Sequence, residues 1–377
     1  MKRILFISHT LDFSAGGAER VFHEVVARID RTRFAPSVFV GGDANGIPQE
    51  YAKVDVPIEA TKTLILHAQK NPIRLLQTAV SVVSLAFALW RKLGREEFDV
   101  AHVNTLFALH FAFLPCMLRG IPVTYHEHGL ARDRDHSVWG QLFPFMARRM
   151  SHIFAITDAV RGEVLSYGID PNRVTTVYNG IDASCSKPTI EEAHSDAFRI
   201  AQVANFLEWK DHPTVLRALA LLRKNVPEAR LVLYGQSKNP AYEKSLQEIV
   251  AAEGLGDCVE FGGYRNDLME FLDEFDCLVV ASRAEPFGLV LLEAMRADVP
   301  VAASNGGGVP EIVTDGENGL LFPPGDPLGL AKALERIARE PGLPIKLRTG
   351  GHLAIRERFS FDAQIQKMQA LFEIAAR

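Results

Sequence analysis

Short runs of aliphatic and β-branched residues alternate with longer helix-like segments along almost the whole chain, and this alternation constrains the fold most strongly. The runs are continuously apolar, which is typical of strands buried on both faces of a parallel sheet. Such strands need helical crossovers, so the pattern predicts doubly wound α/β domains. The predicted strands are Ile4–Ser8, Ser37–Val40, Val100–Val103, Val123–His126, Ile153–Ile156 and Val174–Val177, followed by Ile200–Val203, Leu231–Tyr234, Val259–Phe261, Cys277–Ala281 and Val301–Ala303.

The length of 377 residues favours two domains over one compact core. Each half has its own series of predicted strands, and a polar stretch over residues 182–197 separates them. The sequence therefore predicts an N-terminal Rossmann-like domain, residues 1–182, and a C-terminal Rossmann-like domain, residues 183–361. We expect a final helix, residues 362–377, to pack back on the first domain.

Charge and cysteine content exclude some classes of protein. Residues 1–182 contain 20 Lys and Arg against 18 Asp and Glu, and residues 183–377 contain 21 against 28. A nucleic-acid-binding protein normally carries a basic stripe, so we expect no nucleic-acid partner. Four cysteines without a C-x-x-C pair favour reduced thiols in a cytoplasmic protein, and they are Cys116, Cys185, Cys258 and Cys277.

The segment Ile73–Leu93 is strongly apolar, but its uninterrupted part, Ala79–Trp90, is shorter than the roughly 20 residues that a membrane-spanning helix needs. This length favours a helix packed on the core of an α/β domain. Because Arg91 and Lys92 follow the apolar body, a helix that lies on an anionic membrane surface is the alternative.

Ligands of doubly wound sheets bind beyond the carboxyl ends of the strands, so functional residues are expected in the loops there. The loop after the fourth predicted strand of the second series contains Glu285, and Glu293 follows in the next predicted helix. That helix is predicted to begin at Leu289, and the N–H groups of Gly288, Leu289 and Val290 at its start lack intrahelical partners. Such a helix start suits a diphosphate, and the carboxylates suit sugar hydroxyls.

The stretch from Glu285 to Glu293 resembles the E-x7-E signature of retaining glycosyltransferases of family 4, which have the GT-B fold of two facing Rossmann-like domains. Three further segments resemble motifs of this family and occur in the same order. They are Ser14–Arg20, similar to its first glycine loop, Tyr178–Asp182, similar to its interdomain N-G-[IV]-D, and Gly306–Gly319, similar to its late G-G-x-P-E…D-G-x-x-G stretch. The resemblance covers nearly the whole chain.

The resemblance implies a role for each matching residue. Glu293 would bind the ribose hydroxyls of a nucleotide-sugar donor, and Glu285 would hold hydroxyls of the transferred sugar. The backbone of residues 288–290 would meet the sugar and the phosphate. Gly16 and Gly17 would close over the diphosphate from the first domain, because glycine lets the backbone approach a ligand closely.

The expected phosphate site departs from the family pattern at one position. Family members commonly have an Arg and a Lys five residues apart after the first strand of the second domain. Lys210 matches the Lys, but Asn205 occupies the Arg position. Diphosphate stabilisation would therefore depend more on Lys210 and on the helix start, with Asn205 offering uncharged donors.

Two histidines, His126 and His128, stand at the end of a predicted strand. We expect their imidazoles to point to opposite faces of the chain and to be poor joint metal ligands. The family pattern selects His128 as the residue near the donor sugar or the reaction centre and leaves His126 in the core or behind it, although the reverse assignment stays open.

The sequence offers no convincing metal site. Asp133-Arg134-Asp135 resembles the metal-binding D-x-D of a different transferase fold, but it lies in a charged loop with no strand before it and is typical of a solvated charge run. We expect no metal and no cofactor besides the nucleotide-sugar co-substrate.

The resemblance implies a metal-independent, retaining transfer of a hexose or N-acetylhexosamine, from UDP in preference to GDP, to a glycan or lipid-linked acceptor in polysaccharide or glycoconjugate assembly. No nucleophile is evident, so the leaving phosphate would take the acceptor proton while Glu285, His128 and Lys210 position and polarise the reacting groups. A lipid-linked acceptor would bring the N-terminal domain to the inner face of the cell membrane.

Two alternatives stay open: a nucleotide-sugar epimerase on the same fold, and a catalytically silent nucleotide-sugar-binding protein. The acidic pair and Lys210 favour an enzyme, whereas Asn205 favours the silent protein. A dinucleotide oxidoreductase is disfavoured, because Gly16-Gly17 lacks the G-x-G-x-x-G spacing.

Overall fold

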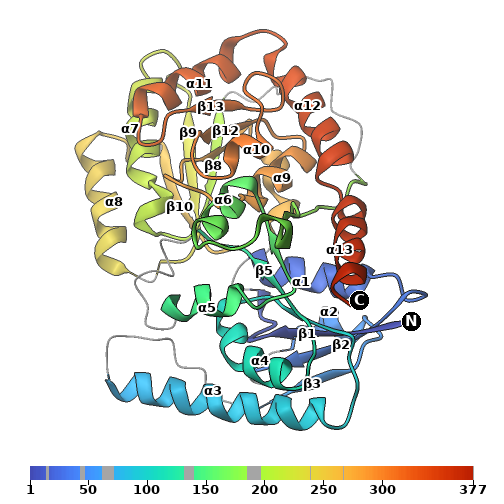
Figure 1. Cartoon of the computed structure of the whole chain (residues 1–377). Coiled ribbons are helices and arrows are strands. Elements are labelled where there is room, and N and C mark those ends of the chain that lie inside the picture. The colour runs from blue at the N-terminus through green and yellow to red at the C-terminus, as the bar shows by residue number, and fades with distance from the viewer. Residues whose placement is uncertain are drawn as a thin grey trace. The chain divides into compact units, whose positions relative to one another are not determined.

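The computed structural model describes residues 1–13, 17–42, 47–61, 72–130, 140–184, 197–237, 239–265 and 267–376, apart from the side chains of Pro72 and Arg74. The chain divides into two compact units, Met1–Tyr178 with Asp362–Arg377 (unit 1) and Asn179–Phe361 (unit 2). Each unit contains one parallel sheet with its own helices (Figure 1). The predicted class, two Rossmann-like doubly wound domains, is confirmed.

The sheet of unit 1 has seven strands in the order β3-β2-β1-β4-β5-β6-β7. Its strands are β1 (Lys2–Ser8), β2 (Phe34–Val40), β3 (Ile58–Ala60), β4 (Val100–Val103), β5 (Val123–Glu127), β6 (His152–Ala155) and β7 (Val174–Thr176). The helices are α1 (Gly17–Arg28), α2 (Gln49–Ala52), α3 (Pro72–Leu93), α4 (Leu106–Leu118), α5 (Phe143–Ala147), α6 (Asp158–Ser166) and α13 (Phe361–Ala375).

Helix α13 packs on unit 1. Phe372 lies in the core of this unit, with its ring centroid 5.9 Å from that of Phe6 and 5.5 Å from that of Phe154. The backbone N–H of Asp30 donates to Gln369 Oε1 at 2.7 Å. Aromatic burial of this kind is strongly stabilising, so the last helix completes the core of the unit that begins the chain.

The sheet of unit 2 has six strands in the order β10-β9-β8-β11-β12-β13. Its strands are β8 (Arg199–Val203), β9 (Arg230–Tyr234), β10 (Val259–Gly263), β11 (Cys277–Val280), β12 (Val301–Ser304) and β13 (Leu320–Phe322). The helices are α7 (His212–Leu222), α8 (Pro240–Ala252), α9 (Leu289–Arg296), α10 (Val309–Ile312), α11 (Pro327–Arg339) and α12 (Leu343–Arg358).

The eleven predicted strands are all present, and two edge strands were missed. β3 and β13 have three residues each and lie at the ends of their sheets. β7 is an edge strand of the same length that was predicted, because the β-branched run Val174–Val177 extends beyond it. In β3 the apolar pattern is interrupted by Glu59, and β13 is confined between Gly319 and Pro323. Cys116, Cys258 and Cys277 are buried free thiols, and Cys185 lies outside the described residues. Among the described helices, none has the length and hydropathy that crossing a bilayer requires.

Candidate active site

The carboxyl ends of three neighbouring strands of unit 2 lie together, and the loops after them carry the predicted donor-site residues. β8, β11 and β12 lie side by side and run parallel. Lys210 follows β8, Glu285 follows β11, and the glycines at 306–308 follow β12. Because parallel strands place their carboxyl ends together, three stretches that are distant in the sequence meet beyond these strand ends.

Lys210 and Glu285 form an ion pair with 2.7 Å between Lys210 Nζ and Glu285 Oε2. The exposed fraction is 19% for the Lys210 side chain and 9% for that of Glu285. Ser282 Oγ donates a further hydrogen bond to Glu285 Oε2 at 2.7 Å. Within the described part of the chain no hydrogen bond reaches Oε1, so this oxygen is left for a ligand hydroxyl.

The local backbone fixes where Lys210 points. Its Nζ lies 4.0 Å from the centroid of the Trp209 ring, a favourable position for a cation over an aromatic face. Gln202, on β8, donates from Nε2 to the carbonyl of Lys210 at 3.1 Å. Asp211 then adopts a left-handed φ of 51° and starts α7. Lys210 is therefore held in the turn between a strand and a helix.

A close backbone contact fixes the position of Glu285. It forms an isolated parallel bridge with Gly307, and the N–H of Gly308 donates to the carbonyl of Glu285 at 2.8 Å. Gly307 has a φ of 65°, and a Cβ at this position would lie 2.2 Å from the carbonyl oxygen of Glu285. Only glycine fits here. Gly307 and Gly308, which follow β12, thus hold the backbone of Glu285, the catalytic candidate that follows the neighbouring strand β11.

The N-terminus of α9 lies beside the ion pair. Gly288 precedes the helix with a φ of 89°, and a Cβ there would lie 3.3 Å from Glu285 Cγ. Leu289 and Val290 form the first turn, so the helix offers their N–H groups no acceptor. Helix amides and a lysine around a buried carboxylate suit a diphosphate that carries a sugar.

The remaining predicted residues of unit 2 lie farther out on the same loops and helix. Glu293 is half-buried on α9, and Asn205 is exposed after β8. Asn205 Oδ1 accepts a hydrogen bond from the backbone N–H of Gln236 at 3.1 Å. This bond ties together the loops after β8 and β9, and it leaves the Nδ2 donors of Asn205 for a ligand.

In unit 1, His128 is connected to the start of α1. Gly17 is the first residue of that helix, and Gly16 lies outside the described residues. Asn104 Nδ2 donates to the carbonyl of Ala18 at 3.3 Å, so its Oδ1 accepts from His128 Nε2–H at 2.9 Å. Asn104 was not among the predicted site residues, although its place directly after β4 was a usable signal.

The expectation that the two imidazoles point to opposite faces is wrong. The ring centroids of His126 and His128 are 4.1 Å apart. Residues two apart in a strand share a face, because successive side chains alternate. His126 is fully buried and His128 is half-buried at the end of β5. Burial lowers the pKa of both rings, that of His128 to about 3, so both are neutral at pH 7.

Glu19 is a second unit 1 residue that the sequence analysis missed. It lies in the first turn of α1 and is 5% exposed. Burial, with a smaller contribution from the nearby Asp12 charge, raises the pKa of Glu19 to about 7. Carboxyls with perturbed pKa values cluster at functional sites, and this one adjoins the first glycine loop. Nothing in the spacing of the motif predicted its burial.

No cluster of three or more His, Cys, Asp or Glu side chains in the described ranges is arranged to hold a metal ion. The Asp133-Arg134-Asp135 segment lies outside those ranges.

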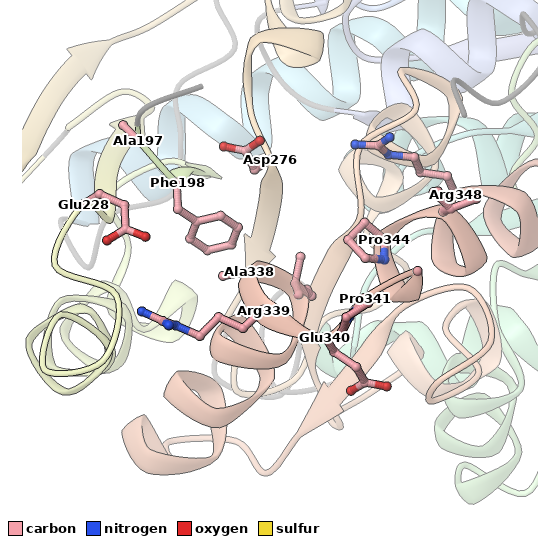
Figure 2. Close-up of a pocket in the computed structure, with 13 residues that line it drawn as sticks. Ala197, Phe198, Glu228, Asp276, Ala338, Arg339, Glu340, Pro341, Pro344 and Arg348 are labelled. Carbon is pink, nitrogen blue, oxygen red and sulfur yellow. The ribbon is translucent and has the colours of Figure 1, made fainter. Parts of the chain in front are cut away.

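A cavity of about 310 Å³ opens at the amino ends of the unit 2 strands, opposite the candidate site (Figure 2). Its lining includes Phe198, directly before β8, and Asp276, directly before β11. These residues mark the amino ends of the strands, whereas Lys210 and Glu285 follow the carboxyl ends. The cavity is therefore separate from the candidate site.

Two family models match the chain, one over most of unit 1 and the other over most of unit 2. The model described as Glycosyltransferase Family 4 matches residues 15–184. The model described as Glycosyl transferases group 1 matches residues 187–352. Together they include all the predicted site residues.

Individual relatives agree with the family models. D-inositol 3-phosphate glycosyltransferase of Streptomyces scabiei is 27% identical over 292 residues, covering 70% of this chain and 65% of the relative. Lipopolysaccharide core biosynthesis glycosyltransferase LpsE of Rhizobium meliloti is 31% identical over 169 residues, covering 45% of this chain and 48% of the relative. The chain thus spans between about half and two thirds of the length of these two relatives.

Solved structures show the same architecture. The crystal structure of Anabaena HepE in complex with UDP and glucose matches with a TM-score of 0.80 at 22% identity, covering 99% of this chain and 100% of HepE. The predicted GT-B fold is confirmed.

Proposed function

Because the chain belongs to glycosyltransferase family 4, we propose that it transfers a sugar from a nucleotide-activated donor to a saccharide acceptor. The observation that carries this proposal is the Lys210–Glu285 ion pair beside the first turn of α9. The cation and the helix amides can bind a diphosphate, while the free Oε1 of Glu285 can accept a sugar hydroxyl.

The proposed donor is a UDP-sugar, with a GDP-sugar next, and the transferred group is a hexose or N-acetylhexosamine. Its ribose would contact Glu293, and its diphosphate would lie at residues 288–290. Gly16 and Gly17 would approach the diphosphate from unit 1. The fold that the chain shares with HepE, which was solved with UDP and glucose, supports testing UDP first.

The proposed transfer is retaining and needs no metal. Negative charge grows on the diphosphate as its bond to the sugar breaks, and Lys210 with the α9 amides would stabilise that charge. A leaving-phosphate oxygen would accept the proton of the acceptor hydroxyl, which attacks from the same face. Glu285 and the neutral His128 would hold and polarise the sugar. Asn205 would donate to the phosphate without adding charge.

The proposed acceptor is a glycan or a lipid-linked saccharide in polysaccharide or glycoconjugate assembly. With a lipid-linked acceptor the enzyme would work as a peripheral protein on the cytoplasmic face of a membrane.

Assays with single donors test this proposal. The protein is incubated with UDP-glucose, UDP-N-acetylglucosamine or GDP-mannose, with and without a mixture of saccharide and lipid-linked acceptors, in EDTA. Acceptor-dependent release of nucleotide, with NMR showing a retained anomeric configuration, would support it. Conversion of the donor sugar without acceptor would indicate an epimerase, and nucleotide binding without any turnover would indicate a silent protein.

A further inference from the structure

Helix α3 of unit 1 exposes its most apolar side. Ile73, Leu76, Val80, Val83 and Phe87 recur at alternating steps of three and four residues, which places them on one face of the helix. All five are between 61% and 68% exposed. At 1.5 Å per residue this stripe is about 21 Å long.

The opposite side of α3 is more polar, yet it is the buried one. Thr78, Ser81, Leu85, Leu89 and Lys92 are each less than a tenth exposed. Lys92 Nζ pairs there with Glu96 at 2.8 Å and with Glu59 at 3.3 Å. The sequence correctly predicted a helix packed on the domain, but it did not predict that the pure apolar stripe faces outward.

Two neighbouring elements continue the exposed apolar surface. α4 packs alongside α3 (Figure 1) and exposes Leu114, Met117 and Leu118. Phe145 of α5 is 52% exposed, and its ring contacts Phe113 of α4 at 6.4 Å between centroids. Unit 2 exposes large apolar side chains only singly on separate elements within its described residues. An exposed apolar surface this large normally marks an interaction site.

The helices of this surface carry basic and no acidic side chains, whereas Glu96, Glu97 and Asp99 follow α3 and line a cavity together with Arg119. Residues 72–93, 106–119 and 140–149 contain no Asp or Glu, in a chain whose net charge is −5. Four exposed arginines accompany the apolar side chains. Two of them lie over aromatic rings, with 4.0 Å from Arg119 Cζ to the Trp90 centroid and 3.9 Å from Arg149 Cζ to the Phe145 centroid. The other two are Arg91 and Arg148, and Arg148 Nη2 also donates to the carbonyl of Tyr167 at 2.7 Å.

From this geometry we infer that α3, α4 and α5 form a membrane-docking surface for anionic phospholipid. The apolar stripe of α3 lies among the acyl-chain ends of the headgroup region, and the arginines contact lipid phosphates. A partner protein helix would also cover the stripe, but it would not explain the absence of acidic residues from all three helices. The inference deepens the proposed function, because it names how the enzyme reaches a lipid-linked acceptor.

Flotation with vesicles tests the surface directly. The full chain is mixed with phosphatidylcholine vesicles that contain roughly one third phosphatidylglycerol, a mixture that gives a negative surface. We expect the protein to float with these vesicles at low salt, and to float at least tenfold less with pure phosphatidylcholine. The double variant Val80→Asp/Val83→Asp should lose at least tenfold in the fraction bound.

A matched control makes the same chemical change elsewhere. Leu328→Asp/Leu353→Asp alters two leucines of unit 2 that are 53% and 52% exposed, and it should float like the wild type. Absence of flotation, or equal flotation of both variants, would overturn the inference. So would light scattering that shows a dimer of the wild type that Val80→Asp/Val83→Asp abolishes, because a second copy would then cover the stripe.

UDP binding by the same samples separates this inference from the proposed function. Protein that binds UDP but not vesicles contradicts the surface alone. Protein that binds vesicles but neither UDP nor GDP contradicts the proposed donor site alone.

Discussion

Lys210 Nζ lies 2.7 Å from Glu285 Oε2, although 75 positions separate the two residues in the sequence. The bond joins the loops after two adjacent strands of unit 2, β8 and β11. It places a cation and an acceptor oxygen next to the start of α9, so a single contact combines the two chemical properties that a sugar diphosphate requires.

Removing the charge of Lys210 should lower the rate of sugar transfer strongly and change the free energy of unfolding little. We predict that Lys210→Met lowers kcat by about a hundredfold or more, equivalent to about 3 kcal/mol of lost stabilisation of the leaving group. Steady-state kinetics would measure this loss, and Lys224→Met, a change at an exposed lysine, should leave kcat unchanged. Equal kcat values for the two variants would remove Lys210 from the mechanism.

Gly307→Ala should destabilise unit 2 because the new Cβ meets the carbonyl oxygen of Glu285. Gly316→Ala is the matched control, since φ is 70° there and no atom lies within 4 Å of the added Cβ. Backbone strain alone costs about 1 kcal/mol, and the clash at Gly307 adds to it. Thermal unfolding should show a clearly larger fall in Tm for Gly307→Ala. Similar falls would mean that the close approach is absent in solution.

Glu19 should make stability depend on pH in the acidic range. Its pKa of about 7 in the folded protein lies above the ordinary value of 4.5. Between these two pH values the folded state therefore retains a proton that the unfolded state has lost. The stabilisation from this proton is complete below about pH 4.5 and disappears as the pH rises through 7, with a limit of about 3 kcal/mol.

Glu19→Gln is the variant that isolates this effect. The difference in unfolding free energy between wild type and Glu19→Gln should change by up to about 3 kcal/mol between pH 4.5 and 7 in denaturant titrations. The buried histidines titrate in both proteins and cancel in the difference. A difference that does not change with pH would show that Glu19 is ionised in the folded state.

Asn104 should set the protonation of His128. In the wild type the imidazole is neutral and donates from Nε2 to the amide oxygen of Asn104. Asn104→Asp puts a carboxylate at that position, which favours the imidazolium, so the pKa of His128 should rise. NMR titration of the ring protons measures this, with the buried His152 as the internal control. An unchanged pKa would contradict the hydrogen bond.

The sequence was sufficient to predict the sheets and the loops that carry the site, because buried parallel strands have continuous apolar runs. Val100–Val103 was predicted with its observed ends, and α9 was predicted to start at Leu289. The short edge strand β13 was not predicted, since its three apolar residues are confined between Gly319 and Pro323.

Contacts between distant residues were beyond prediction for a different reason. Nothing in the motif around Gly306 indicates that Gly307 touches Glu285, because the contact depends on which strands are neighbours in the sheet. The same holds for Asn104, which meets His128 only through the pairing of β4 with β5. The outward apolar stripe of α3 also depends on packing, since its spacing fits a buried helix equally well.

Binding of UDP, measured by calorimetry, tests the donor site most directly. A ligand that binds only the native site also raises Tm, which gives a second readout on the same samples. The account predicts that the wild type and Glu253→Ala, a change at an exposed glutamate outside the site, bind UDP alike, while Glu293→Ala binds at least tenfold more weakly. Equal UDP affinity for all three proteins, or no binding of either UDP or GDP by the wild type, would contradict a donor site at α9.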